Sequence, residues 1–150
     1  ARDLAAHAAA GASSALAAGA GEIYHAWSAI DGDRATAWTE GAAGAGQGEW
    51  LLLEFPEAVR VQGIGMDIGF DRSAELFRLN HRAGSVTLLF STGEEVALEW
   101  EDVRDIQYLR RPGQGIETRF VKVIVEGVFA GERYDDTCIS EIEVWGAPVR

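Results

Sequence analysis

Residues 86–100 read VTLLFSTGEEVALEW, which is two runs of alternating apolar residues joined by a short polar segment with a glycine. The alternating apolar residues are Val86, Leu88, Phe90, Val96, Leu98 and Trp100. A period of two places successive side chains on opposite faces of an extended strand, and the Ser-Thr-Gly-Glu segment between the runs is typical of a turn. The stretch therefore predicts a β-hairpin, the clearest one in the chain.

Other segments have the length and composition of strands. Residues 50–55 form a short apolar run that ends at Pro56 and is typical of a buried strand. Apolar residues also alternate over 59–70, but the alternation changes parity at Gly63, which indicates one long strand bent at a β-bulge. Further strands are predicted over 118–126 and 139–145, and a weaker first strand over 12–16.

Length and composition set the limits of this interpretation. The chain has 150 residues, 47% of them hydrophobic, and a formal net charge of -11. These values predict one globular domain over 1–150, in which residues 1–10 are a linker or a short helix. The acidic charge argues against a nucleic-acid partner, and the apolar runs are too short for membrane insertion. Strands separated by turns, with almost no helical period, predict an all-β sandwich or barrel.

The stretch over 28–38 reads SAIDGDRATAW and concentrates oxygen-bearing side chains in a tight loop. Hard cations such as calcium require several converging oxygen ligands, and Gly32 permits the backbone to turn its carbonyls inward. The spacing is not that of an EF-hand, so further ligands must come from elsewhere; the obvious donor is the stretch 135–142 (DDTCISEI) near the end of the chain. The alternative is an Asp-Gly turn anchored by Trp38.

Three segments resemble discoidin-like modules of the galactose-binding fold: 29–38, 119–123 and 139–144. Four others are similar to the glycan-binding-type module attached to bacterial NAD-glycohydrolase toxins and to other bacterial surface proteins. These are 36–41 (TAWTEG), 46–50 (GQGEW), 80–82 (NHR) and 136–141 (DTCISE). The motifs occur in the expected order over nearly the whole chain.

The resemblance implies a galactose-binding-domain-like jelly-roll β-sandwich of about eight strands, with a non-catalytic role. It also implies a structural Ca²⁺ that ties the first long loop to the last strand. Carried over by position, the ligands are the Ser28 carbonyl, the Asp31 side chain, the Asp33 carbonyl, the Thr36 carbonyl and hydroxyl, the Ser140 carbonyl and the Glu141 side chain.

The sequence offers no catalytic constellation of its own. The three histidines lack zinc spacing, and no Ser-His-Asp or Cys-His set is assembled. Cys138, the single cysteine, lies in strand-like sequence and is expected to be buried. Trp38, Trp50, Trp100 and Trp145 fall on or beside strands and are expected in the core. The prediction is that the chain is not an enzyme.

A polar stretch over 71–82 is predicted to be an irregular loop, and loops at the ends of a sandwich commonly carry binding residues. The residues predicted to bind a ligand are Phe70, Phe77, Asn80, His81, Arg82 and Tyr134. The aromatic rings would face a pyranose, and Asn80 and Arg82 would bind its hydroxyl or acid groups. The alternative is that Asn80 and Arg82 are structural.

These patterns predict a carbohydrate-binding module that is secreted or on the cell surface and targets a larger bacterial protein to a glycan or glycoprotein. The alternative is a protein-interaction or toxin-translocation module on the same fold, without affinity for sugars.

Overall fold

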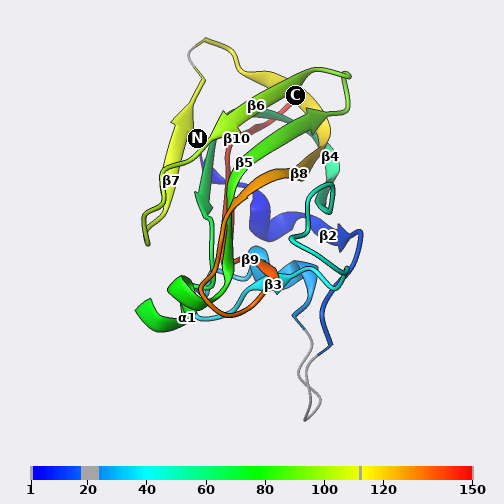
Figure 1. The fold of residues 1–150 in the computed structure, drawn as a ribbon. Coiled ribbons are helices and arrows are strands. Elements are labelled where there is room, and N and C mark those ends of the chain that lie inside the picture. Colours follow the sequence, from blue (N-terminus) through cyan, green and yellow to red (C-terminus); the bar gives the residue numbers. More distant parts are fainter. Residues whose placement is uncertain (1, 18–23, 112, 150) are drawn as a thin grey trace.

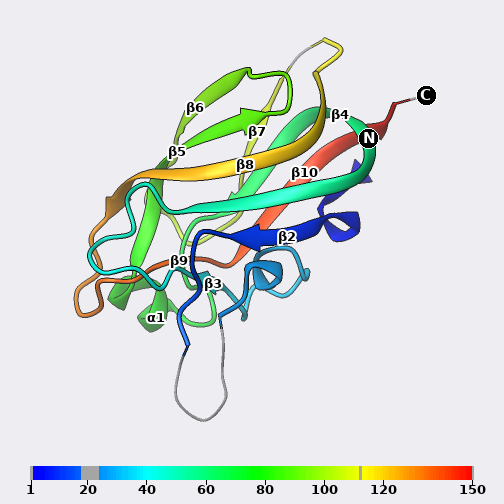
Figure 2. The same ribbon diagram turned by 90° about the vertical axis from the view of Figure 1, so that its right-hand side faces the viewer.

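The computed structural model describes residues 2–17, 24–111 and 113–149 of the protein and shows a curled β-sandwich (Figures 1 and 2). The strands are β1 (Arg2–Asp3), β2 (Ala9–Ala12), β3 (Trp38–Thr39), β4 (Trp50–Asp67), β5 (His81–Phe90), β6 (Glu95–Glu99), β7 (Gln107–Arg110), β8 (Ile116–Phe129), β9 (Thr137–Ile139) and β10 (Glu141–Pro148). The short helices are η1 (Ala5–His7), η3 (Ala26–Ala29) and α1 (Ala74–Leu79). The predicted all-β jelly-roll class is confirmed.

Two layers share the long strand β4. One layer orders β2, the first half of β4, β8, β5 and β6. The other orders β1, β10, the second half of β4 and β7. All these pairings are antiparallel; β9 joins the start of β5 in parallel. The predicted hairpin is confirmed as β5 and β6, with Val86 opposite Leu98 and Leu88 opposite Val96.

β4 can serve both layers because it bends. The apolar run predicted to stop at Pro56 continues through it, so the predicted strand end is wrong. The register with β10 passes from Gly63 opposite Trp145 to Val61 opposite Gly146. Gln62 is therefore the extra residue of a bulge, which confirms the predicted change of parity beside Gly63.

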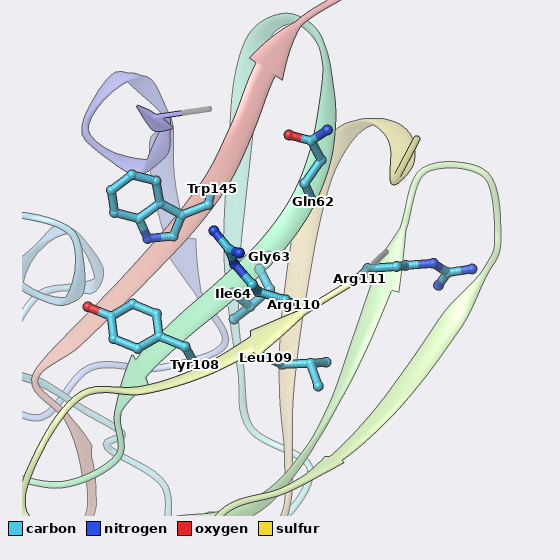
Figure 3. A pocket seen from close by; sticks show the side chains of 8 residues that line it. All are labelled: Gln62, Gly63, Ile64, Tyr108, Leu109, Arg110, Arg111 and Trp145. Carbon is cyan, nitrogen blue, oxygen red and sulfur yellow. The ribbon is translucent and has the colours of Figure 1, made fainter. Parts of the chain in front are cut away.

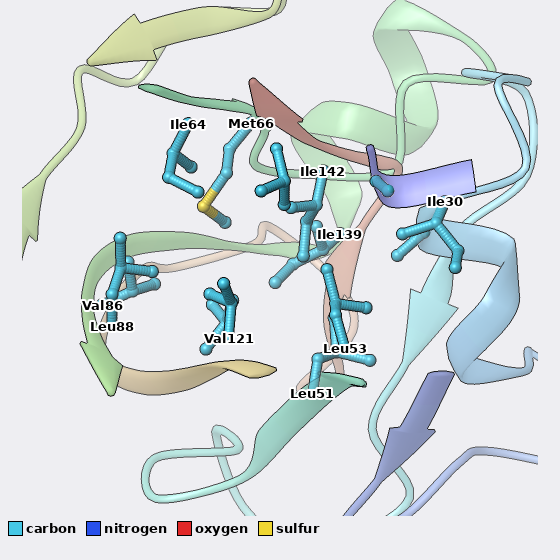
Figure 4. Packing of buried hydrophobic residues seen from close by; sticks show 14 of the residues in the cluster. Ile30, Leu51, Leu53, Ile64, Met66, Val86, Leu88, Val121, Ile139 and Ile142 are labelled. Carbon is cyan, nitrogen blue, oxygen red and sulfur yellow. The ribbon is translucent and has the colours of Figure 1, made fainter. Parts of the chain in front are cut away.

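The core lies between the two layers and is built from the inward face of each strand (Figure 4). Leu51 and Leu53 come from the first half of β4, whereas Ile64 and Met66 come from its second half, and all four side chains are buried. Further buried side chains in this cluster are Val86, Leu88, Val121, Val123, Ile142 and Val144.

Two segments differ from the predictions. Residues 1–10 were predicted as a linker or a short helix. They contain the short helix η1, but β1 and β2 flank it and Leu4 and Ala5 are buried, so this segment is not a linker and the first strand precedes the predicted 12–16. The stretch over 71–82 is not irregular, because α1 begins after Ser73, whose hydroxyl accepts a hydrogen bond from the Leu76 amide (3.0 Å). That Ser N-cap was the missed signal.

Candidate functional site

The Asp31 loop, which we define as residues 30–37, connects η3 to β3. Two Asx turns shape it: the Asp33 amide donates to Asp31 Oδ1 (3.0 Å), and the Ala35 amide donates to Asp33 Oδ1 (2.9 Å). Gly32 has a φ of 76°, a conformation that favours glycine. Ile30 and Trp38 are buried at the two ends of the loop, so the backbone between them is fixed to the core.

Three oxygen atoms surround the Thr36 hydroxyl in this loop. They are Asp31 Oδ2 at 2.5 Å, the Asp33 carbonyl at 2.9 Å and the Ser28 carbonyl at 3.3 Å. A hydroxyl carries only one proton and can donate fully to only one acceptor. The loop therefore gathers more oxygen lone pairs than its own hydrogens can satisfy.

Glu141 supplies a second carboxylate from the first residue of β10. Its Oε1 accepts a long hydrogen bond from the Gly32 amide (3.3 Å), which joins it to the Asp31 loop. Its Oε2 is buried and has no hydrogen-bond partner among the described residues. Burial, aided by the charge of Asp31 and opposed by the Gly32 hydrogen bond, raises the pKa of Glu141 to about 8. A charged Glu141 is thus uncompensated in this position, which is costly for a buried carboxylate.

The six residues predicted to hold calcium are brought together in part by these contacts. The Ser28 carbonyl, the Asp31 carboxylate and the Asp33 carbonyl converge on the Thr36 hydroxyl, and all four groups are among the predicted ligands. Glu141 faces the same loop. Ser140 precedes Glu141 in the chain and is held at the end of β4, because its amide donates to the Asp67 carbonyl (3.1 Å) and its hydroxyl accepts from the Asp71 amide (2.8 Å).

The donor set fits a hard cation. It contains carboxylate, hydroxyl and carbonyl oxygens, the ligands that calcium prefers, and it includes an orphaned carboxylate oxygen. Within 2–17, 24–111 and 113–149, no group of three or more His, Cys, Asp or Glu side chains could hold a metal ion. The site has only two acidic side chains, so most of its ligands would be backbone and hydroxyl oxygens.

A network of ion pairs that was not predicted from the sequence holds this loop against the end of β4. Arg34 Nε binds Asp67 Oδ2 (3.0 Å), and Arg34 Nη2 binds Asp71 Oδ2 (2.5 Å). Arg104 also pairs with Asp71. Burial, followed by the hydrogen bond with Asp71, raises the pKa of Asp67 to about 7. Arg34 therefore ties the Asp31 loop to the end of β4.

Five of the six predicted ligand-binding residues are buried: Phe70, Phe77, Asn80, His81 and Arg82. Arg82 forms two bonds with Asp102 (3.0 and 2.8 Å), and its Nη1 donates to three backbone carbonyls at 3.0–3.2 Å. Asn80 donates to the Leu76 carbonyl (3.0 Å). These contacts favour the structural alternative for Asn80 and Arg82.

The other predicted ligand residues differ in their surroundings. His81 Nδ1 accepts a hydrogen bond from the Gly131 amide (2.6 Å), so the histidine orients the loop before β9. Phe70 contacts Tyr24 edge to face at 5.9 Å. Tyr134 is the exposed member of the set, 39% accessible, with the Arg133 guanidinium 5.3 Å from its ring centre.

The tryptophans divide between core and surface. Trp38 is fully buried, as predicted. Trp145, also predicted in the core, is half-buried and lines an open groove of about 880 Å³ on the outer face of β4, β7 and β10 (Figure 3). The sequence alone did not indicate this groove, because the groove forms only where β7 pairs with Gly63 and Gly65 of β4.

A protein-family model described as "NAD glycohydrolase translocation F5/8 type C domain" matches residues 3–145. No curated protein matches the chain significantly. None of the described helices is long and apolar enough to cross a membrane.

Solved structures of carbohydrate-binding modules share the fold. The family 32 module of NanJ from C. perfringens, solved with galactose, is 18% identical with a TM-score of 0.71, over 95% of this chain and 97% of that one. A module from the Clostridium perfringens protein CpGH89, solved with GalNAc-β-1,3-galactose, is 16% identical with a TM-score of 0.72, over 96% and 99%. A chitosan-binding module from Paenibacillus is 20% identical with a TM-score of 0.67, over 97% and 98%.

Proposed function

The chain belongs to the NAD glycohydrolase translocation F5/8 type C domain family, and on that premise we propose that it is a calcium-stabilised module that binds glycans. It is a non-catalytic module of discoidin-like fold. In this role it would be secreted or exposed at the cell surface and would target an accompanying domain of a larger bacterial protein to a glycan or glycoprotein.

The observation that carries the calcium proposal is the orphaned oxygen cluster between the Asp31 loop and Glu141. When bound, calcium would neutralise the Asp31 and Glu141 carboxylates and satisfy the surplus lone pairs around Thr36. The chain's own residues fix the geometry: the Asx turns orient Asp31, and Arg34 fixes the loop against Asp67. A cation there would connect the Asp31 loop to β10. Because this loop lies between η3 and β3, the cation would also stabilise that end of the sandwich.

Glycan binding is supported by the fold, since sugars are bound by the related modules named above. The test is a glycan array probed with the isolated chain in calcium-containing buffer. Saturable binding to defined glycans supports the proposal. A folded chain that binds no glycan on the array would overturn it.

A second candidate is a translocation or protein-interaction module without sugar affinity, which the description of the family favours. The two candidates differ in one experiment. If the chain promotes entry of a fused reporter into cells whose surface glycans have been removed enzymatically, the translocation function stands without the glycan.

A further inference from the structure

The outer face of the layer that contains β7, β4 and β10 carries the groove introduced above, which we name the Tyr108–Trp145 groove. It is lined by Gln62, Gly63, Ile64, Tyr108, Leu109, Arg110, Arg111 and Trp145. Figure 1 shows β7 on the flank of the sandwich, whereas α1 and the turn into β9 lie at its lower end. The groove is therefore distinct from the loops in which ligand residues were predicted from the sequence.

The strand register explains the shape of the groove. In one row Tyr108 lies opposite Gly65, which lies opposite Glu143; in the next row Arg110 lies opposite Gly63, which lies opposite Trp145. Both central positions are glycine, so no side chain rises from β4 between the flanking strands. A Cβ on Gly65 would lie only 2.8 Å from the Tyr108 ring, which shows how closely that ring covers the strand.

Glu143 holds both aromatic rings in place. The Trp145 indole nitrogen donates to Glu143 Oε1 (2.8 Å), and the Tyr108 hydroxyl lies 3.5 Å from Glu143 Oε2. Tyr108 is nevertheless 59% exposed. Two aromatic side chains anchored through one carboxylate lose little freedom when a ligand binds, because their orientation is already set.

Two polar side chains in the groove have unused hydrogen-bonding capacity. Arg111 is paired with Glu94 (2.7 Å), but the side chains of Arg110 and Gln62 make no ion pair or hydrogen bond with the rest of the described chain. Figure 3 shows the Arg110 side chain directed toward the space between the Trp145 and Tyr108 rings. An unpaired guanidinium beside exposed aromatic faces is a donor available to a ligand.

From these contacts we infer that the Tyr108–Trp145 groove binds one sugar ring. A pyranose has an apolar C–H face that suits an aromatic surface and a rim of hydroxyls that needs donors and acceptors. The groove supplies both: Tyr108 and Trp145 provide the apolar surface, Arg110 and Gln62 donate, and Glu143 accepts. The inference rests on the proposed glycan-binding function and places its site on the flank of the sandwich.

The test uses two sugars that differ only at C6, galactose and galacturonic acid, titrated at millimolar concentrations into the ¹⁵N-labelled chain with calcium present. Saturable amide shifts should concentrate at 63–65, 107–111 and 143–146. Tyr108→Ala should weaken binding of both sugars about tenfold, the loss of one good aromatic contact. Arg110→Ala should weaken galacturonic acid more than galactose, because the guanidinium would pair with the carboxylate.

Matched variants separate the groove from general effects. Trp27→Ala removes another exposed aromatic (56% accessible), and Arg119→Ala removes an exposed strand arginine for which no side-chain ion pair is found among the described residues. Both should leave affinity unchanged, and thermal melts verify that every variant is folded.

Three results would overturn the inference: shifts confined to the loop around Tyr134, unchanged affinity in Tyr108→Ala, or no saturable shift in the groove with either sugar. The glycan array distinguishes this failure from that of the proposed function. If Tyr108→Ala/Arg110→Ala retains the array binding of the original chain, the groove assignment is wrong and glycan binding stands. If the original chain binds nothing on the array, both fail.

Discussion

Replacing Glu141 by glutamine should stabilise the calcium-free protein near pH 8, and calcium should cancel that gain. The substitution keeps the size of the side chain and removes its charge. In calcium-free protein, burial raises the pKa of Glu141 from an ordinary 4.5 to about 8. The folded state therefore keeps a proton that the unfolded state loses first. The free energy of unfolding falls as pH rises through this window, by at most about 1.4 kcal/mol per pH unit.

The glutamine side chain has no proton to lose in this range, so the variant does not show this fall in the free energy of unfolding. In calcium-free buffer it should match the original chain below about pH 4 and exceed it by a few kcal/mol at pH 8. Asp67, whose pKa is raised to about 7 by burial, adds a pH dependence of the same sign to both proteins, so the difference between them isolates Glu141.

Calcium should cancel the variant's advantage at pH 8. A ligand that binds only the folded state stabilises it by about 4.1 kcal/mol at a concentration 1,000 times its Kd, which is comparable to that advantage, and the variant should gain little. The assay is urea unfolding followed by tryptophan fluorescence, with Glu99→Gln, an exposed carboxylate on β6, as the control. The reasoning is refuted if Glu141→Gln destabilises the protein equally with and without calcium.

Two further substitutions and one labelling experiment test contacts that stabilise the fold. Arg82→Ala should cost about 1–3 kcal/mol of unfolding free energy in urea, because three backbone carbonyls lose their donor, whereas exposed Arg119→Ala should cost less than about 0.5 kcal/mol; similar losses would remove the structural role of Arg82. Burial raises the pKa of the Cys138 thiol to about 12, so a thiol reagent at pH 8 should label the protein only in denaturant, and rapid labelling of the native chain would contradict this burial. Gly113 and Gly115 have φ values of 85° and 75°, but of the two only Gly115 would bring an added Cβ against a backbone oxygen, that of Val61 at 2.1 Å. The free energy of unfolding of Gly115→Ala should therefore be about 1–3 kcal/mol lower than that of Gly113→Ala. Equal stabilities of the two variants would be inconsistent with that contact.

The all-β class and the main hairpin could be predicted from sequence because their signals are local. Alternation over residues 86–100 fixes which side chains face the core, and the change of parity at Gly63 marks the bulge. Strand β7 was missed, since its four residues are too few to show an alternating apolar run. They pair with Gly63–Met66, more than forty positions away in the sequence.

The candidate sites divide in the same way. The oxygens that surround the Thr36 hydroxyl come from residues 28–33, close to Thr36 in the sequence, so a tight loop could be predicted to gather them. Arg82 looked like a surface donor, but its partner Asp102 and the carbonyls of α1 come from elements whose positions only the folded chain defines. The Tyr108–Trp145 groove likewise depends on the register of three strands.

A crystal grown in calcium and soaked with galactose and galacturonic acid tests the central claim most directly, because it reports metal and sugar together. The account predicts an anomalous calcium peak about 2.3–2.6 Å from the oxygens of Asp31, Thr36 and Glu141, with sugar density against the protein surface. A crystal of the folded chain with neither the calcium peak nor sugar density would contradict it.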